Sequence, residues 1–150
     1  MSVRSNGRRA ALLVRVAATM SVVSVALRFE TTQDVLRRML GTCALRRPER
    51  ATLDRVRRYV DLLLFRIPFP GADGRCVPRS IVIARFARQL GFDARVQFGI
   101  RRTSDGLMGH AWVVIDGAPV FEAPGKVEQF EETFQFPTGG RVTSVAPDIR

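Results

Sequence analysis

The chain has little of what a metal site or a disulfide framework requires. It contains one histidine, His110, one tryptophan, Trp112, and two cysteines, Cys43 and Cys76. Two cysteines in 150 residues do not make a disulfide framework, and with one histidine they cannot supply the ligands of a spaced zinc site. We therefore expect no metal and no cofactor. Covalent or acid–base chemistry is the main catalytic option that remains.

Lysine is almost absent as well, because Lys126 is the only one and arginine supplies the other basic residues. Lysine and arginine together number 24 against 14 acidic residues, a formal net charge of +10. A coding bias toward arginine would produce this charge without any function, whereas a basic surface would favour an acidic peptide, an anionic lipid or a nucleic acid. No helix-turn-helix or RNA-stacking motif accompanies the charge. We expect no nucleic acid partner and leave contact with a membrane surface open.

The N-terminal region is apolar and flanked by basic residues. Residues 9–28 predict a helix with little polar face, which would be buried in the core or covered by a partner. The region superficially resembles a signal peptide. Arg15 interrupts the apolar run, however, the stretch from there to Arg28 is too short for a bilayer span, and no small-residue cleavage site follows. We expect a cytoplasmic protein.

Two more helices are predicted before Cys76. The first, within residues 30–41, has an N-cap at Thr31 or Thr32 and a stop at Gly41. The second has Pro48 as its first residue. Its apolar face is predicted to comprise Leu53, Val56, Val60 and Leu63 or Leu64. Residues 66–75, which hold two prolines and two glycines, predict a loop.

Cys76 lies at the start of a further predicted helix, because Pro78 fits only a first turn and Gly91 is typical of a helix end. The hydrophobic period then changes to alternation. Strands are predicted at 94–100, 110–115 and 119–123, a loop at 101–109, and a short helix or edge strand within 125–136. Helices followed by antiparallel strands predict an α+β fold.

A cysteine at a helix start with a histidine on a later strand is the order of papain-like enzymes. A helix N-terminus and a nearby imidazolium both lower the pKa of a thiol, so Cys76 and His110 are candidates for a nucleophile and its base. In the alternative interpretation, Cys76 is a small buried hydrophobe and His110 packs against Trp112. Cys43 precedes no helix start and is interpreted as structural.

A third residue would orient the imidazole, and two acids are near enough in sequence. Asp116 lies in a turn and is expected to point away, whereas Glu122 lies on the returning strand. A two-residue turn would put His110 and Glu122 on opposite faces. A three-residue turn over 115–117, with Gly117 at positive φ, would put them directly opposite each other, and we predict this turn. The alternative is that Glu122 is a surface residue of an exposed strand.

The block "GRCVPRSIVIARFARQLGFDARVQFGIRR…GHAWVVIDGAPVFE" resembles the transglutaminase-like lasso-peptide biosynthesis B proteins in their split B2 form. The resemblance covers about residues 70–123. The positions that match the family's pattern are Cys76, Arg79, Ser80, Gly91, Phe92, Gly99 to Arg101 and His110 to Val113. The family's aspartate falls on Glu122, and Val114 replaces a common glutamate.

The resemblance implies a papain/transglutaminase-like core in which the Cys-bearing helix packs on a small antiparallel sheet. It also implies a cysteine leader peptidase with Cys76 as nucleophile, His110 as base and Glu122 as the third residue. Such proteins cut the leader from a lasso precursor, so that a separate ATP-dependent cyclase can close the macrolactam. The implied partners are the leader of the precursor, the small leader-recognition protein B1 and the cyclase.

We predict one domain over 1–150, with a helical N-terminal region in 1–66, the catalytic core in 67–136 and a loose tail in 137–150. Two other functions stay open. One is an acyl transferase of the same fold, in which an amine intercepts the thioester instead of water. The other is a non-catalytic basic binding module, for which the net charge is the best argument.

Overall fold

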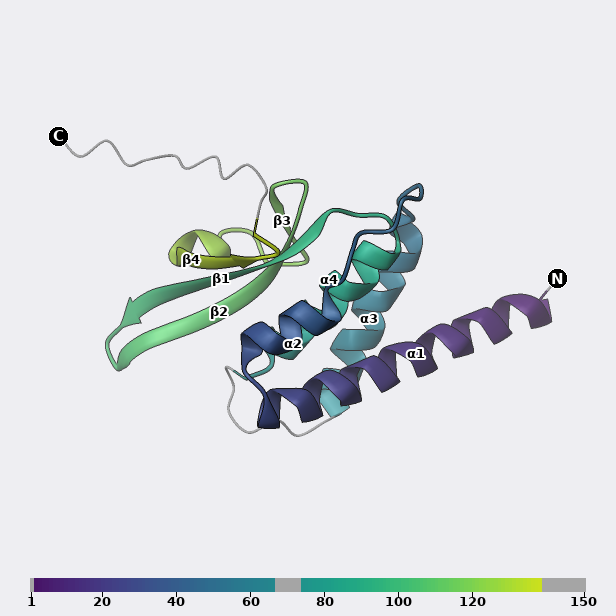
Figure 1. The fold of residues 1–150 in the computed structure, drawn as a ribbon, viewed down its shortest axis with the longest axis horizontal. Helices are drawn as coiled ribbons and strands as arrows, with labels where there is room; N and C mark the ends of the chain where they lie inside the picture. Colours follow the sequence, from purple (N-terminus) through teal and green to yellow (C-terminus); the bar gives the residue numbers. More distant parts are fainter. Residues whose placement is uncertain (1, 67–73, 139–150) are drawn as a thin grey trace.

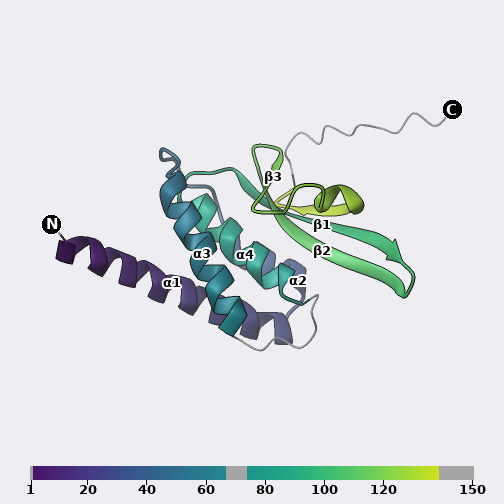
Figure 2. The ribbon, with the colours of Figure 1, turned by 180° about the vertical axis from the view of Figure 1, so that it is seen from behind.

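The computed structural model describes residues 2–66 and 74–138 (Figure 1). Within these ranges the helices come first and an antiparallel sheet follows, so the predicted α+β class is confirmed. Figures 1 and 2 show the helices together on one side of the molecule and the strands on the other. The loop predicted over 66–75 and the loose tail predicted over 137–150 lie largely outside the described residues.

The first helix, α1 (Ser2–Phe29), is longer than the predicted 9–28. One side of it is buried in the core and the other is exposed. The buried side holds Val16, Met20 and Val23, and the exposed side holds Val14, Val22, Val25 and Phe29. By length and composition, Asn6–Phe29 could cross a membrane, with a mean hydropathy of 2.0 even though it includes Arg15. Core helices of soluble proteins and signal sequences meet the same criterion.

The short helix α2 (Thr32–Met39) begins as predicted, with the side-chain oxygen of Thr31 accepting from the backbone N–H of Asp34 at 3.2 Å. The third helix, α3 (Arg50–Arg66), begins two residues after the predicted Pro48. The reason is that Glu49 occupies the capping position, where its carbonyl accepts from the N–H of Leu53. The predicted apolar face is confirmed by four buried residues: Leu53, Val56, Val60 and Leu64.

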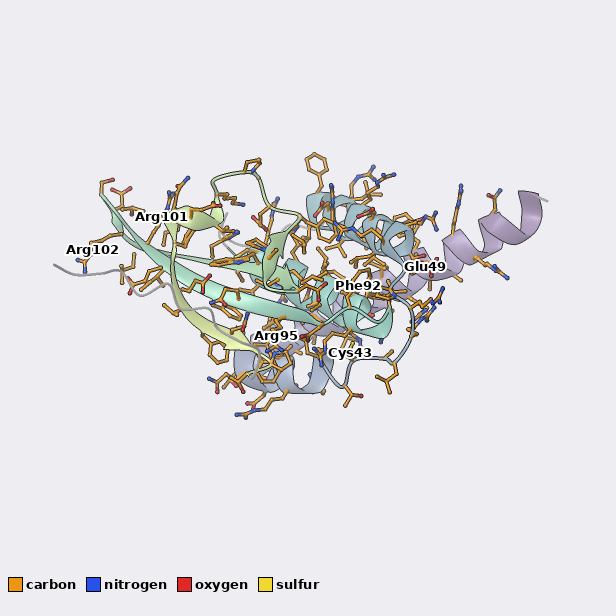
Figure 3. The ribbon with its side chains drawn as sticks, turned by 90° about the horizontal axis from the view of Figure 1, so that it is seen from above. Cys43, Glu49, Phe92, Arg95, Arg101 and Arg102 are labelled. Atoms are coloured by element: carbon orange, nitrogen blue, oxygen red, sulfur yellow. The ribbon has the colours of Figure 1, made fainter. Side chains whose placement is uncertain are left out.

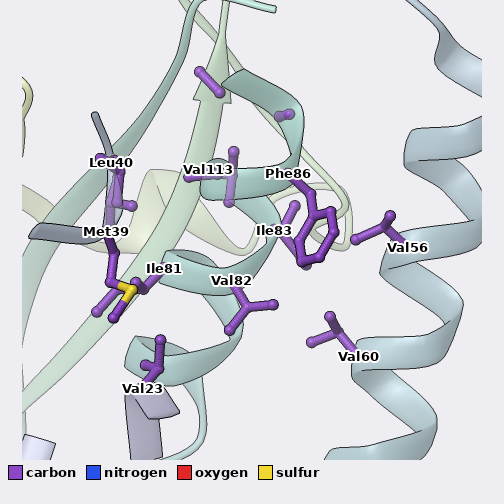
Figure 4. Packing of buried hydrophobic residues seen from close by; sticks show 14 of the residues in the cluster. Val23, Met39, Leu40, Val56, Val60, Ile81, Val82, Ile83, Phe86 and Val113 are labelled. Atoms are coloured by element: carbon purple, nitrogen blue, oxygen red, sulfur yellow. The ribbon is translucent and has the colours of Figure 1, made fainter. Parts of the chain in front are cut away.

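Helix α4 (Cys76–Gln89) lies between the other helices and the sheet, in contact with α1 and α3 on one side and with two strands on the other. One apolar side of α4 packs against these helices, and the other packs against the strands. Figure 4 shows Phe86 directed toward Val56 of α3, and Val113 of the sheet beside the other side of the helix. The predicted helix end is confirmed, because Gly91 follows it with φ +90°. This packing fixes the position of Cys76 relative to the strands.

The sheet has the order β3-β2-β1-β4 and is antiparallel throughout. Its strands are β1 (Ala94–Thr103), β2 (Gly106–Ile115), β3 (Ala118–Val120) and β4 (Glu131–Phe136), and the 3-10 helix η1 (Val127–Gln129) precedes β4. Residues 125–136 therefore contain both a short helix and an edge strand.

The loop predicted over 101–109 is wrong. Strands β1 and β2 continue through this segment to a tight turn, where Thr103 pairs with Gly106. Figures 1 and 2 show this end of the hairpin extending beyond the helices. On one face of the strands there, Arg101 and Met108 are half-buried, and the other face is exposed. Because the half-buried face includes an arginine, the side chains do not alternate between apolar and polar, and the sequence loses its strand period.

The three-residue turn predicted over 115–117 is also wrong. Ile115 pairs with Ala118, so the turn between β2 and β3 has only two residues, Asp116 and Gly117, with φ of 52° and 80°. Aspartate tolerates the left-handed conformation, so both turn residues have positive φ and no bulge is needed. The predicted positive φ of Gly117 is confirmed.

Candidate active site

Cys76 and His110 are brought together by the packing of α4 on β2. Cys76 is the first residue of α4, and His110 lies within β2. The thiol and the imidazole are hydrogen-bonded to each other. The fold thus pairs the helix-start cysteine with the only histidine of the chain.

Glu122 contacts the same imidazole. Its Oε2 lies 3.1 Å from Nε2 of His110, and the two side chains are only 5% and 11% exposed. Since Nε2 faces the carboxylate, Nδ1 is left for the thiol. The structure therefore brings Cys76, His110 and Glu122 into one hydrogen-bonded series, with the imidazole in the middle.

The path of the chain explains this contact in spite of the two-residue turn. Strand β3 ends at Val120, and Phe121 has φ 62°, in the left-handed region. A residue in that conformation breaks the alternation of side chains along a strand. Glu122, one residue later, is therefore free of the hairpin register that would have put it on the face opposite His110.

Arg79 holds this segment in place. Its guanidinium contacts Oε1 of Glu122 at 3.2 Å and donates to the backbone carbonyl of Phe121 at 3.2 Å. Its Nε donates to Oδ1 of Asp61 on α3 at 2.7 Å. The resemblance marks Arg79 without giving it a role. The sequence could have indicated this role of Arg79, because Arg79 lies one helical turn after Cys76. Its partner Asp61 is revealed only by the packing of the helices.

Lys126 is a second cation in contact with Glu122, with Nζ 3.2 Å from Oε2.

Asp116, the other acid considered from the sequence, lies in the β2–β3 turn as expected. Among residues 2–66 and 74–138, no group of three or more His, Cys, Asp or Glu side chains is placed to hold a metal ion.

The hydrogen bonds shift all three pKa values toward the charged forms. Burial would raise the pKa of Cys76, but hydrogen bonds with the His110 side chain and the Ala111 backbone hold it below the ordinary 9.0. The hydrogen bond with Cys76, followed by the one with Glu122, raises the pKa of His110 to about 9. Burial would raise the pKa of Glu122, but the His110 hydrogen bond and the Lys126 charge lower it. The site thus favours a thiolate–imidazolium pair.

Aromatic rings fix the orientation of the imidazole. The ring of Trp112 stacks on His110 at 5.8 Å between centroids, and the ring of Phe130 lies at 5.2 Å. Trp112 shares the face of His110, as predicted, and is only 1% exposed. Gly99 makes room for this packing, because a Cβ there would lie 2.8 Å from Trp112 and 2.9 Å from Phe130.

Two pockets open at Cys76 and His110. One of about 460 Å³ lies on the side of Glu122 and includes Arg75 and Arg101 in its lining. The other, of about 420 Å³, is lined mainly by apolar groups and includes Val77 and Ile100. Both pockets are lined by Cys76, Gly109 and His110. A bound chain could therefore lie across the thiol with side chains on either side of it.

Cys43 lies in a different environment. It is half-buried, and its thiol donates to the backbone carbonyl of Phe92 at 3.2 Å, next to which it is drawn in Figure 3. The neighbouring Ala44 is hydrogen-bonded to Arg88, near the end of α4 away from Cys76. These contacts agree with the structural interpretation of Cys43.

The arrangement of a thiol at a helix start, hydrogen-bonded to a histidine on a strand, can be compared with known protein families. The family model described as the transglutaminase-like superfamily matches residues 9–135. The chain belongs to the transglutaminase-like superfamily. The match includes α2, α3 and most of α1, well beyond the motifs over 70–123. No curated protein matches the chain, and no solved structure matches it.

Proposed function

We propose that the protein is a cysteine peptidase that removes the leader peptide from a lasso precursor. The observation that carries the proposal is the hydrogen-bonded series of Cys76, His110 and Glu122 beside two open pockets. Membership of the transglutaminase-like superfamily supports thiol-based peptidase or acyl-transfer chemistry. The choice of a lasso precursor rests on the motif resemblance over about residues 70–123.

In the proposed reaction, the Cys76 thiolate attacks the carbonyl carbon of the peptide bond and forms a tetrahedral oxyanion. The backbone N–H of Cys76, at the start of α4, is a donor for this oxyanion. The His110 imidazolium gives its proton to the departing amine as the C–N bond breaks, which leaves a thioester on Cys76. Glu122 remains ionised and stabilises the imidazolium.

The second half of the reaction returns the enzyme to its starting state. Neutral His110 takes a proton from a water molecule, and the oxygen of that water attacks the thioester carbon. The C–S bond breaks, the leader leaves as a carboxylic acid, and the thiolate–imidazolium pair is restored. An amine in place of water would form a new amide instead, which is the acyl-transfer alternative.

We propose the partners that the resemblance implies. B1 would present the leader, and the ATP-dependent cyclase would use the amine released from the core peptide. A cytoplasmic location follows from the same proposal, because ATP-dependent cyclisation requires the nucleotide pool of that compartment. The exposed apolar side of α1 is available to such a partner.

Cleavage of a synthetic precursor tests the proposed function, with mass spectrometry of the products and with B1 either present or omitted. We expect two fragments whose summed mass exceeds the precursor by one water. Cys76→Ala and His110→Ala should abolish cleavage, whereas Cys43→Ala should cleave normally. A product that incorporates an added primary amine would favour the acyl transferase. An active Cys76→Ala protein with an inactive Cys43→Ala protein would refute the assignment of the nucleophile.

A further inference from the structure

We infer that the cleft takes a peptide with an acidic side chain on one side of the bond to be cut and an apolar side chain on the other. This inference rests on the proposed function, because it names the substrate class of the same site. It follows from the unequal lining of the two pockets that meet at Cys76 and His110.

The charges of the larger pocket are not balanced. Arg79 and Lys126, which line it, are both paired with Glu122. Arg75 and Arg101 line the same pocket, and in the described part of the chain neither forms an ion pair with a carboxylate. Two cations beside the reactive pair are therefore left for a charge that the ligand brings.

The guanidinium of Arg101 is already held in place. Its Nη1 donates to the side-chain oxygen of Gln129, and its Cζ lies 5.3 Å from the centroid of the Phe130 ring. These contacts orient the guanidinium without neutralising it. A carboxylate on the ligand would gain a charge-assisted hydrogen bond at little further cost in side-chain entropy.

The smaller pocket has the opposite character. Val77, Phe98 and Ile100 contribute its apolar lining, and Ile100 is 37% exposed although it is a large apolar side chain. An aliphatic side chain of a bound peptide would cover this surface.

Gly109 leaves the space between the two pockets open. A Cβ at Gly109 would have no neighbour nearer than the carbonyl oxygen of Gly99, at 4.0 Å, so the packing of the protein does not require a glycine there. Gly109 lines both pockets together with Cys76 and His110. We infer that the absent side chain lets the backbone of the bound peptide lie across β2 close to the thiol.

Peptide binding to the Cys76→Ala protein, followed by calorimetry at low salt, tests the inference without requiring cleavage. The probes are blocked hexapeptides that carry Leu and Glu separated by two alanines, in both orders, each with a twin in which Gln replaces Glu. In one order the Glu peptide should bind about tenfold tighter than its Gln twin, as expected for a charge-assisted hydrogen bond. Equal binding of the twins in both orders would overturn the inference.

Two further variants in the Cys76→Ala background identify the residues responsible. Arg101→Gln should remove the preference for Glu. Arg102→Gln is the matched control, because Arg102 is the next residue of β1 and lines a different pocket; Figure 3 labels both side chains. The control should keep the preference, and an equal loss in both variants would mean that general charge attraction is responsible.

Gly109→Val should weaken the binding of all the peptides at unchanged thermal stability. Unaltered binding would contradict the path of the peptide backbone across β2.

The same peptides separate this inference from the proposed function. A wild-type protein that cuts neither these peptides nor the precursor, while its Cys76→Ala form still prefers Glu through Arg101, would refute the peptidase alone. Cleavage of the precursor with no preference between the Glu and Gln twins would refute the acidic subsite alone.

Discussion

His110 Nε2 lies 3.1 Å from Glu122 Oε2, although the hairpin that ends at Val120 does not set these two residues opposite each other. The contact depends on the left-handed backbone of Phe121, which releases Glu122 from the strand register. Glu122 thus lies in a bend rather than in a strand. Arg79 and Lys126 hold its carboxylate against the imidazole.

Glu122→Gln keeps the shape of this side chain and removes its charge. The variant should lose the stabilisation of the imidazolium, and kcat should fall by up to about 10⁴-fold, as for other acid-to-amide changes in triads. Glu122→Asp retains a carboxylate and introduces the aspartate of the family that the motifs resemble. It should therefore keep substantially more activity than Glu122→Gln. Steady-state kinetics on the precursor measure both. A fully active Glu122→Gln enzyme would leave a Cys76–His110 dyad.

Arg79→Lys tests whether the guanidinium positions Glu122. A lysine cannot contact Asp61, Glu122 and the Phe121 carbonyl at once, so kcat should fall about tenfold or more while KM stays nearly constant. Asp61→Asn is the control, because it weakens the shorter ion pair, 2.7 Å, and leaves the contact with Glu122. If Asp61→Asn loses as much kcat as Arg79→Lys, the guanidinium acts through helix packing instead.

The directions of the pKa shifts predict that activity rises and then falls along the pH axis. The thiolate forms as pH rises through the pKa of Cys76, which lies below 9.0, and the imidazolium is lost as pH rises through about 9, the raised pKa of His110. The rate of cleavage should therefore rise on the acid side and fall near pH 9. Iodoacetamide alkylation of the Cys43→Ala protein measures the acid limb directly. A thiol that reacts only as pH approaches 9.0 would contradict the charged pair.

Gly99→Ala should destabilise the protein because the new Cβ would lie 2.8 Å from Trp112 and 2.9 Å from Phe130. We expect a loss of about 1–3 kcal/mol in the free energy of unfolding, the usual cost of overpacking. Gly109→Ala is the matched control on the paired strand, where no atom lies nearer than 4.0 Å. Urea denaturation compares the two. Equal stability of the variants would mean that the ring packing around His110 yields to the extra methyl group.

Most of the framework follows from local signals in the sequence. The N-cap at Thr31, the apolar face of α3, the first turn of α4 at Cys76 and the end of α4 at Gly91 are each set by neighbours in the chain. The pairing of Cys76 with His110 could be proposed because the chain has one histidine and one helix-start cysteine.

The remaining features depend on contacts that sequence spacing does not encode. The contact between His110 and Glu122 was predicted from a three-residue turn that is absent, since the conformation of Phe121 cannot be read from a phenylalanine in an apparent strand. Arg79 is bound to Asp61 from another helix, and the half-buried face of the outer β1–β2 hairpin includes Arg101, so no apolar period marks it. Each depends on packing across the molecule.

The stacking of Trp112 on His110 has an optical consequence. Trp112 is the only tryptophan, and a protonated imidazole in contact with an indole quenches its emission more strongly than the neutral ring does. Because Trp112 is only 1% exposed, solvent contributes little to its signal. Excitation of the indole therefore reports the charge of the candidate base in the intact protein, with emission brightening as pH rises through about 9. Trp112 is therefore an intrinsic fluorescent reporter of the protonation state of His110.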